Sequence, residues 1–326
     1  MSINKPSVFI GENNQDQLYF TQAKTGINTT DPTEKLEVAG NVKADFFIGD
    51  GSLLTNVGGG AELLPLDNTW TGLNTFTDGL RSEGAGASSF RAGPNAGDDT
   101  MGGQTVAIGN SAGRYRQGNR ALAIGYKAGQ TDQLGEAVAI GDEAGTLDQG
   151  AFAVAVGDSA GKTTQGSYSV AMGIAAGQVT QGSSSTALGP SAAQTNQGQN
   201  STAVGSNAGQ TNQSDYATAV GASAGTTEQG ASSVAVGRNA GNDTQGTSSV
   251  AVGNSAGETS QGLGSVAVGV QSGETTQGDY TVAVGFSAAQ TSQGADGVAI
   301  GRQAAQLTQG DNGVAIGNYA GNDTQG

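Results

Sequence analysis

The segment 157–163 reads Gly-Asp-Ser-Ala-Gly-Lys-Thr and contains the glycines, lysine and hydroxyl from which phosphate-binding loops are built. Only three residues separate Gly157 from Gly161, whereas that motif requires four. No helical pattern follows Thr163, although a helix N-terminus helps such loops to hold phosphate. We therefore interpret the segment as one copy of a repeat and not as a nucleotide site.

The remaining side chains offer few catalytic or metal-binding combinations. The 326 residues include neither Cys nor His, which excludes disulfides, thiolate ligands, and the most common general base and metal ligand. No spacing singles out a pair of catalytic carboxylates, so we expect solvated surface charge, no enzymatic activity, no cofactor and no metal site. The scattered acids include Asp142, Asp158, Glu228, Glu258, Glu274 and Asp279.

The net charge and the hydropathy of the chain limit the classes of partner that it is expected to bind. The net charge is −15, and nucleic-acid binding needs a basic face, so we expect no nucleic-acid partner. No run of 18 apolar residues occurs, so we expect no membrane insertion. The first residues, Met1 to Pro6, lack the apolar core of a signal peptide.

Most of the sequence is an internal repeat, and this repeat predicts the strands and turns that carry the side chains named above. Fourteen copies close to Ser-Val-Ala-Val-Gly-x-Ser-Ala-Gly-x-Thr-x-Gln-Gly-x-x follow one another without a gap, with the same Gly at Gly109, at Gly125 and so on to Gly317. Gly93 is in register with them and marks a degenerate first copy. A fixed period of this kind indicates stacked coils. Three invariant columns are predicted to be structural: Gly (Gly109, Gly237), Ala (Ala107, Ala235) and Gln (Gln117, Gln165, Gln245, Gln325).

Each copy predicts a short strand followed by turns. Val-Ala-Val alternates with period two and is rich in β-branched residues. A coil of 16 residues is too short to form a wide three-sided solenoid easily. It suits a flattened roll in which each coil has two short strands, with turns at Ala-Gly and Gln-Gly. The predicted fold is all-β: an elongated parallel β-roll or β-solenoid of 16-residue coils.

Two arrangements of the strand faces remain open. In the first, the two Val residues of each coil form a thin core and the Ala column lies outside, where its methyl groups let another backbone approach closely. Only 35% of the residues are hydrophobic, so such a roll buries too little surface alone, and we expect three chains to pack through the face of small residues. In the second, the Ala residues fit a narrow lumen and the solenoid is a monomer.

The Gln column also has two interpretations. Gln side chains stacked at strand spacing can hydrogen-bond to one another along the rod, and we favour this ladder. The alternative is a surface that binds sugars.

The repeat resembles the head repeat of trimeric autotransporter adhesins, as in Ser249–Gly257 (Ser-Val-Ala-Val-Gly-Asn-Ser-Ala-Gly). The resemblance covers residues 105–326 and implies a trimer of left-handed parallel β-rolls. Two departures stand out. The period of 16 is longer than the family's usual unit, which implies one wider turn at Thr-x-Gln-Gly. From these residues we also expect neither that family's secretion signal nor its anchor barrel.

Residues 26–57 resemble a module of bacteriophage tail fibres. An Ile-x-Thr-x-x-Pro-x-x-Lys-Leu-x-Val-x-Gly segment starts at Ile27, and Gly-Asp-Gly-Ser-x-Leu-Thr-Asn follows from Gly49. Residues 68–76 are similar to fibre shafts, and Leu36, Val38 and Val42 suggest short alternating strands. A tail fibre is made in the host cytoplasm and needs neither a signal peptide nor Cys, which agrees with this composition.

These observations predict three regions: an N-terminal tail-attachment region (1–57), a shaft or linker with the degenerate first repeat (58–104), and a β-roll of fourteen repeats (105–326). The residues expected to dock on the tail or baseplate are Val8, Phe9, Ile10, Leu18, Tyr19 and Phe20, with packing in a small β cap as the alternative. The aromatic residues that are candidates for receptor contact are Tyr126, Phe152, Tyr168, Tyr216, Tyr280 and Phe286, with isolated turn residues as the alternative.

The function that we expect is structural. The chain would form a homotrimeric tail fibre in the virion, attached to the tail or baseplate and adhering to a glycan or protein of the host surface. Three alternatives stay open: a fibre of a contractile injection system, a cell-surface trimeric adhesin, and an ice-binding β-solenoid. Ice binding requires a regular Thr array, which Tyr115, Leu147 and Val179 interrupt in the Thr column.

Overall fold

The computed structural model of the chain describes residues 7–9, 17–20, 25–27, 36–38, 89–97 and 101–324. The chain divides into two compact units, Met1–Thr75 and Phe76–Gly326, and each is described by itself. In the part of the chain that the structure describes, all regular elements are β-strands. This confirms the predicted all-β class.

The N-terminal unit contains a four-stranded sheet in the order β1-β2-β3-β4. The first three strands are antiparallel and β4 runs parallel to β3, which confirms the strand predicted around Leu36 and Val38. Val8 lies opposite Leu18, whereas Ile10 and Val42 lie outside the described residues. The strands are β1 (Ser7–Phe9), β2 (Gln17–Phe20), β3 (Thr25–Ile27) and β4 (Leu36–Val38).

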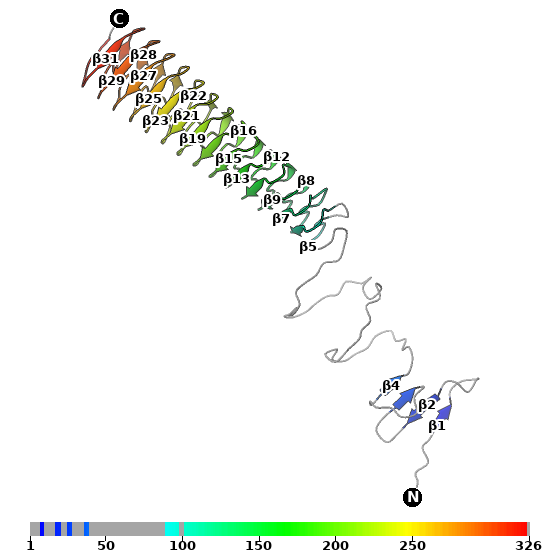
Figure 1. The fold of residues 1–326 in the computed structure, drawn as a ribbon. Coiled ribbons are helices and arrows are strands. Elements are labelled where there is room, and N and C mark those ends of the chain that lie inside the picture. Colours follow the sequence, from blue (N-terminus) through cyan, green and yellow to red (C-terminus); the bar gives the residue numbers. More distant parts are fainter. Residues whose placement is uncertain are drawn as a thin grey trace. The chain divides into compact units, whose positions relative to one another are not determined.

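The repeats form a parallel β-solenoid with one coil for each copy and a sheet on each of its two sides (Figure 1). The first sheet, here called the valine sheet, pairs each Val-Ala-Val segment with its equivalent in the next copy, as in Val154 with Val170. Its first strand pairs Phe90 with Val106, so the copy marked by Gly93 belongs to the solenoid. The strands are β5 (Phe90–Ala92), β6 (Val106–Ile108), β7 (Leu122–Ile124), β9 (Val138–Ile140), β11 (Val154–Val156), β13 (Val170–Met172), β15 (Thr186–Leu188), β17 (Thr202–Val204), β19 (Thr218–Val220), β21 (Val234–Val236), β23 (Val250–Val252), β25 (Val266–Val268), β27 (Val282–Val284), β29 (Val298–Ile300) and β31 (Val314–Ile316).

The second sheet, here called the glutamine sheet, contains the segment that ends in the Gln column. Turns at Ala-Gly and after Gln connect the two sheets, as predicted. The strands are β8 (Thr131–Gln133), β10 (Leu147–Gln149), β12 (Thr163–Gln165), β14 (Val179–Gln181), β16 (Thr195–Gln197), β18 (Thr211–Gln213), β20 (Glu228–Gln229), β22 (Thr244–Gln245), β24 (Ser260–Gln261), β26 (Thr276–Gln277), β28 (Ser292–Gln293) and β30 (Thr308–Gln309).

The Ala column points into the solenoid and the Val residues point outward, which is the reverse of the first arrangement considered above. Ala107 and Ala235 are completely buried inside the solenoid, and the flanking Val234 and Val236 face outward and are only half-buried. The lumen is crowded by Gln side chains: a Cβ placed on Gly113 would come within 2.5 Å of Gln117 Oε1. Because so little room remains, methyl groups fit inside and two Val side chains per coil do not. The expectation of an outer face of small residues was therefore wrong.

The Gly column is required both by backbone conformation and by stacking. Gly237 has φ of 128°, a region that is unfavourable for residues with a Cβ. A Cβ there would also lie 2.4 Å from the carbonyl oxygen of Gly253 in the next coil. The close approach of successive backbones explains why this column contains no other residue.

The glutamine sheet changes its backbone between Asn212 and Glu228. The residue that precedes each Gln, here called the left-handed column, has positive φ in seven successive coils that end at Asn212. From Glu228 onward the equivalent residues do not, and the strands shorten from three residues to two. The left-handed residues are Arg116, Asp132, Asp148, Thr164, Thr180, Asn196 and Asn212.

Candidate functional site

The segment that approaches a phosphate-binding loop is an ordinary coil. Gly157 and Gly161 belong to a turn, and Thr163 begins strand β12 and not a helix. The Lys162 ammonium donates to Glu143 at 2.5 Å, so it is already paired. Across the described ranges, no group of three or more acidic residues is arranged to hold a metal ion. None of the described residues forms a helix long and apolar enough to cross a membrane.

Glu143 joins two lysines from different coils. Its other oxygen lies 3.6 Å from Lys127 Nζ, and the hydrogen bond from Lys162 keeps the pKa of Glu143 below its ordinary value. The pKa of Lys127 is raised, first by its interaction with Tyr126, over whose ring its ammonium lies at 4.8 Å, and then by Glu143. Two more ion pairs, Arg116 with Asp132 and Arg120 with Glu136, join successive coils of the same N-terminal part of the solenoid.

The Gln column forms a continuous ladder inside the lumen. Each side-chain amide donates to the next Gln, as Gln133 does to Gln149 Oε1 at 3.0 Å, and also to a backbone carbonyl of the valine sheet, here Leu122 O at 2.9 Å. The ladder runs from Gln117 to Gln309 and includes Gln165 and Gln245, whereas Gln325 lies outside the described residues. Its amides are buried, so a bound sugar could not reach them, and the structural interpretation is confirmed.

The first residue of the Gln ladder, Gln117, follows a coil that has Met in place of Gln. Met101 occupies the place of the Gln column in the first coil and is 6% exposed. Gln117 Oε1, which would accept from that position, is buried without a hydrogen bond.

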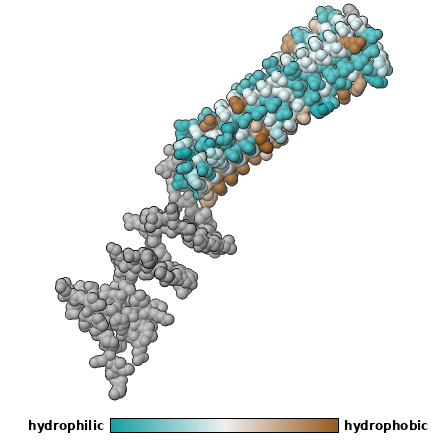
Figure 2. Space-filling model, turned by 180° about the vertical axis from the view of Figure 1, so that it is seen from behind, coloured by the Kyte–Doolittle hydropathy of each residue, from teal (hydrophilic) through white to brown (hydrophobic). Residues whose placement is uncertain are grey.

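The outer side of the valine sheet is an apolar face, defined here by the two outward residues of each Val-Ala-Val segment. Met172 and Leu188 are about 40% exposed, and the equivalent Val residues are mostly half-buried. Figure 2 shows apolar side chains gathered along one edge of the solenoid. In three successive coils the first of the two outward residues is Thr (Thr186, Thr202 and Thr218), whereas the second stays apolar.

The structure brings two of the six aromatic candidates together. Phe152 and Tyr168 stack in neighbouring coils with their ring centres 5.0 Å apart and their planes 5° from parallel. Tyr216 and Tyr280 occupy the equivalent turn position in distant coils, and Tyr280 lies against Gly264 of the coil before it. Tyr126 and Phe286 lie on the other turn of their own coils. All six side chains are between 44% and 63% exposed, which leaves their surfaces accessible.

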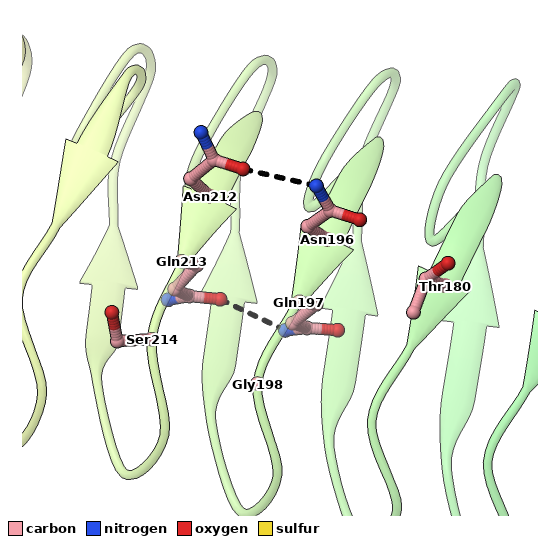
Figure 3. A pocket seen from close by; sticks show the side chains of 7 residues that line it. All are labelled: Thr180, Asn196, Gln197, Gly198, Asn212, Gln213 and Ser214. Atoms are coloured by element: carbon pink, nitrogen blue, oxygen red, sulfur yellow. Dashed lines mark hydrogen bonds between the residues drawn. The ribbon is translucent and has the colours of Figure 1, made fainter.

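A shallow polar groove on the glutamine sheet was not predicted. It has a volume of about 280 Å³ and is lined by residues of three successive coils (Figure 3). The lining residues are Thr180, Asn196, Gln197, Gly198, Asn212, Gln213 and Ser214. Asn196 Nδ2 donates to Asn212 Oδ1 at 3.0 Å, in parallel with the buried bond between Gln197 and Gln213. Two signals in the sequence mark this place. Asn precedes Gln in two successive copies (Asn196 and Asn212), and Ser214 stands where nearly all copies have Gly.

Comparisons with protein families, with curated proteins and with solved structures return no match to this chain.

Proposed function

We propose that this chain is a structural fibre protein of a virion tail, which attaches by its N-terminal region and adheres to the host surface through the solenoid. The observation that carries the proposal is the apolar face, which follows the valine sheet from coil to coil. The apolar face would bind other copies of the chain, and the polar side of the solenoid would remain available to other molecules. This division suits a protein that displays a surface and attaches to a host. The resemblance of residues 26–57 to tail-fibre modules supports the virion as the place of action.

The proposed fibre is a homotrimer that packs through the apolar face. Inside each coil the core consists of Ala methyl groups and Gln amides, so the larger apolar side chains are left on the outer side. Packing three copies around one axis would bury these side chains and remove them from water, which is the main driving force of association. The Val and Ile residues thus take the place that we first expected the Ala column to fill.

The N-terminal sheet is the proposed attachment region. It contains Val8 and Phe9 on β1, and Leu18, Tyr19 and Phe20 on β2. A tail or baseplate protein would be the partner there. Two of the rivals, a fibre of a contractile injection system and a cell-surface trimeric adhesin, would use the same solenoid with other partners.

Sedimentation equilibrium of the full chain tests the assembly. We expect three times the 32.0 kDa of one chain. The double variant Val204→Lys/Val236→Lys places charges on the apolar face and should give a monomer that keeps its β circular dichroism. The matched variant Thr227→Lys/Thr259→Lys places the same charges on exposed positions beside the glutamine sheet and should stay trimeric. A monomeric wild-type chain would overturn the homotrimer.

Binding of the labelled chain to bacterial cells tests adhesion. A truncated chain that begins at residue 76 should retain cell binding but lose attachment to tails, because the proposed docking strands precede it. If the full chain binds neither cells nor tails, the proposed role is wrong.

A further inference from the structure

We infer that the polar groove of the glutamine sheet binds a neutral, linear saccharide. The inference deepens the proposed function, because it names a ligand class and a site for adhesion. The groove is a surface of the glutamine sheet, and the apolar face lies on the other sheet, so the site would stay open in the proposed trimer.

The groove presents hydrogen-bonding groups that the chain itself does not use. The bond between Asn196 and Asn212 leaves the Asn212 amide hydrogens and the second lone pair of the Asn212 carbonyl free to bind. The hydroxyl groups of Thr180 and Ser214 make no hydrogen bond within the described part of the chain. The groove therefore offers both donors and acceptors, and the hydroxyl groups of a sugar require both, since each hydroxyl donates and accepts.

The spacing of these groups suits a chain-like ligand. Thr180, Asn196 and Asn212 occupy the same position in successive coils, so they repeat at the strand spacing of about 4.8 Å along the rod. An extended saccharide that lies along the rod would meet one such side chain with each successive sugar ring.

The charge around the groove selects against anionic sugars. Residues 163–237 contain no Lys or Arg. Asp215 follows Ser214 directly, and its carboxylate accepts the backbone N–H of Gln199 at 2.7 Å, so a negative charge is fixed beside the groove. A carboxylate or sulfate on the ligand would find no cation and would be repelled.

The backbone at the groove has the left-handed conformation that all seven coils from Arg116 to Asn212 share, so the departure that is particular to the groove lies in its side chains. Thr180, a β-branched residue, has φ of 53°, and the equivalent residues from Glu228 onward avoid this conformation. Ser214 adds a hydroxyl where Gly198 has none, and at Gly198 a Cβ would lie 2.4 Å from Asp215 N. The departure from the consensus thus places a polar group in the groove.

Isothermal titration of the full chain with neutral hexasaccharides of glucose, mannose, galactose and N-acetylglucosamine, and with hexagalacturonate, tests the site. We expect one neutral sugar to bind and the anionic sugar to bind at least tenfold more weakly. The variant Asn212→Asp/Ser214→Gly restores the consensus Gly and replaces the amide donor with a charge, and it should weaken binding at least tenfold. The matched variant Thr244→Ala/Leu134→Gly changes the same two coil positions outside the groove and should bind like wild type.

Two results would overturn the inference: no neutral hexasaccharide binds, or the groove variant binds as tightly as wild type. Cell adhesion measured with the same proteins separates this failure from that of the proposed function. If wild type and groove variant adhere to cells equally, the groove is not the adhesive site although the fibre adheres. If the sugar binds wild type and no cell does, the groove stands and the adhesive role fails.

Discussion

Gln165 Nε2 lies 3.0 Å from Gln181 Oε1 inside the solenoid, and both side chains are at most 2% exposed. The same amide group of Gln165 also donates to the backbone carbonyl of Val154 across the lumen at 2.9 Å. One side chain therefore joins two successive coils and also the two sheets. The core depends on these polar bonds as well as on its methyl groups, because an unpaired amide in the lumen is costly.

Gln181→Leu should lower stability markedly. The substitution removes the acceptor of Gln165 and the donor to Gln197 Oε1, and it also removes the hydrogen bond that the carbonyl of Val170 accepts from the side chain. We expect a loss of about 2–3 kcal/mol in the free energy of unfolding. Urea unfolding followed by circular dichroism checks this, with Gln199→Leu on the exposed surface as the control. Equal midpoints for the two variants would contradict a structural ladder.

Met101→Gln should stabilise the solenoid. A Gln at this position would donate to the buried Gln117 Oε1 and extend the ladder by one coil. The gain expected from satisfying one buried acceptor is about 1 kcal/mol. Thermal unfolding of this variant is compared with that of Met101→Leu, which keeps the apolar volume. A midpoint no higher than that of the Leu variant would show that the first coil does not join the ladder.

Gly237→Ala should destabilise the coil far more than Gly135→Ala does. The first substitution combines positive φ with a contact of 2.4 Å to the next backbone, whereas at Gly135 the nearest atom is Asn119 O at 3.3 Å and φ is not positive. A strained backbone position costs about 1–3 kcal/mol before the clash is added. Unfolding midpoints of the two variants measure the difference. Similar midpoints would mean that the stacked backbones can move apart.

The ion pairs of Glu143 should make stability fall in acid. Because its pKa is lowered in the folded chain, the carboxylate stabilises the fold above its ordinary pKa of about 4.3, and this contribution is lost as the pH falls through the lowered value. The pairs are partly exposed, so the effect should be below about 1 kcal/mol and should shrink in salt. Urea midpoints between about pH 5 and pH 3 are compared for wild type, Glu143→Gln and the control Glu258→Gln. Only Glu143→Gln should flatten the profile.

Much of the solenoid could be predicted because each repeat aligns with the next. The period, the Val-Ala-Val strand, both turns and the Gln ladder follow from columns such as Gly109 and Gln117. Alternation defines two faces of a strand but not which of them points inward. That choice depends on the space between the sheets, which the Gln side chains already fill.

The polar groove could not be predicted from any single copy. It arises where Thr180, Asn196 and Asn212 adjoin Ser214 across three coils, and it depends on a backbone conformation that ends before Glu228. A search for departures from the consensus would have found Ser214, but the unused hydrogen-bonding groups beside it are visible only in three dimensions.

The direction of the hydrogen bonds has a mechanical consequence. The bonds between successive strands, and those of the Gln ladder, all connect one coil to the next. A tensile load along the axis therefore passes through every junction in series, and the weakest junction sets the force at which the rod yields. Adding coils would lengthen the rod without strengthening it, and a pull on one end would unwind it coil by coil.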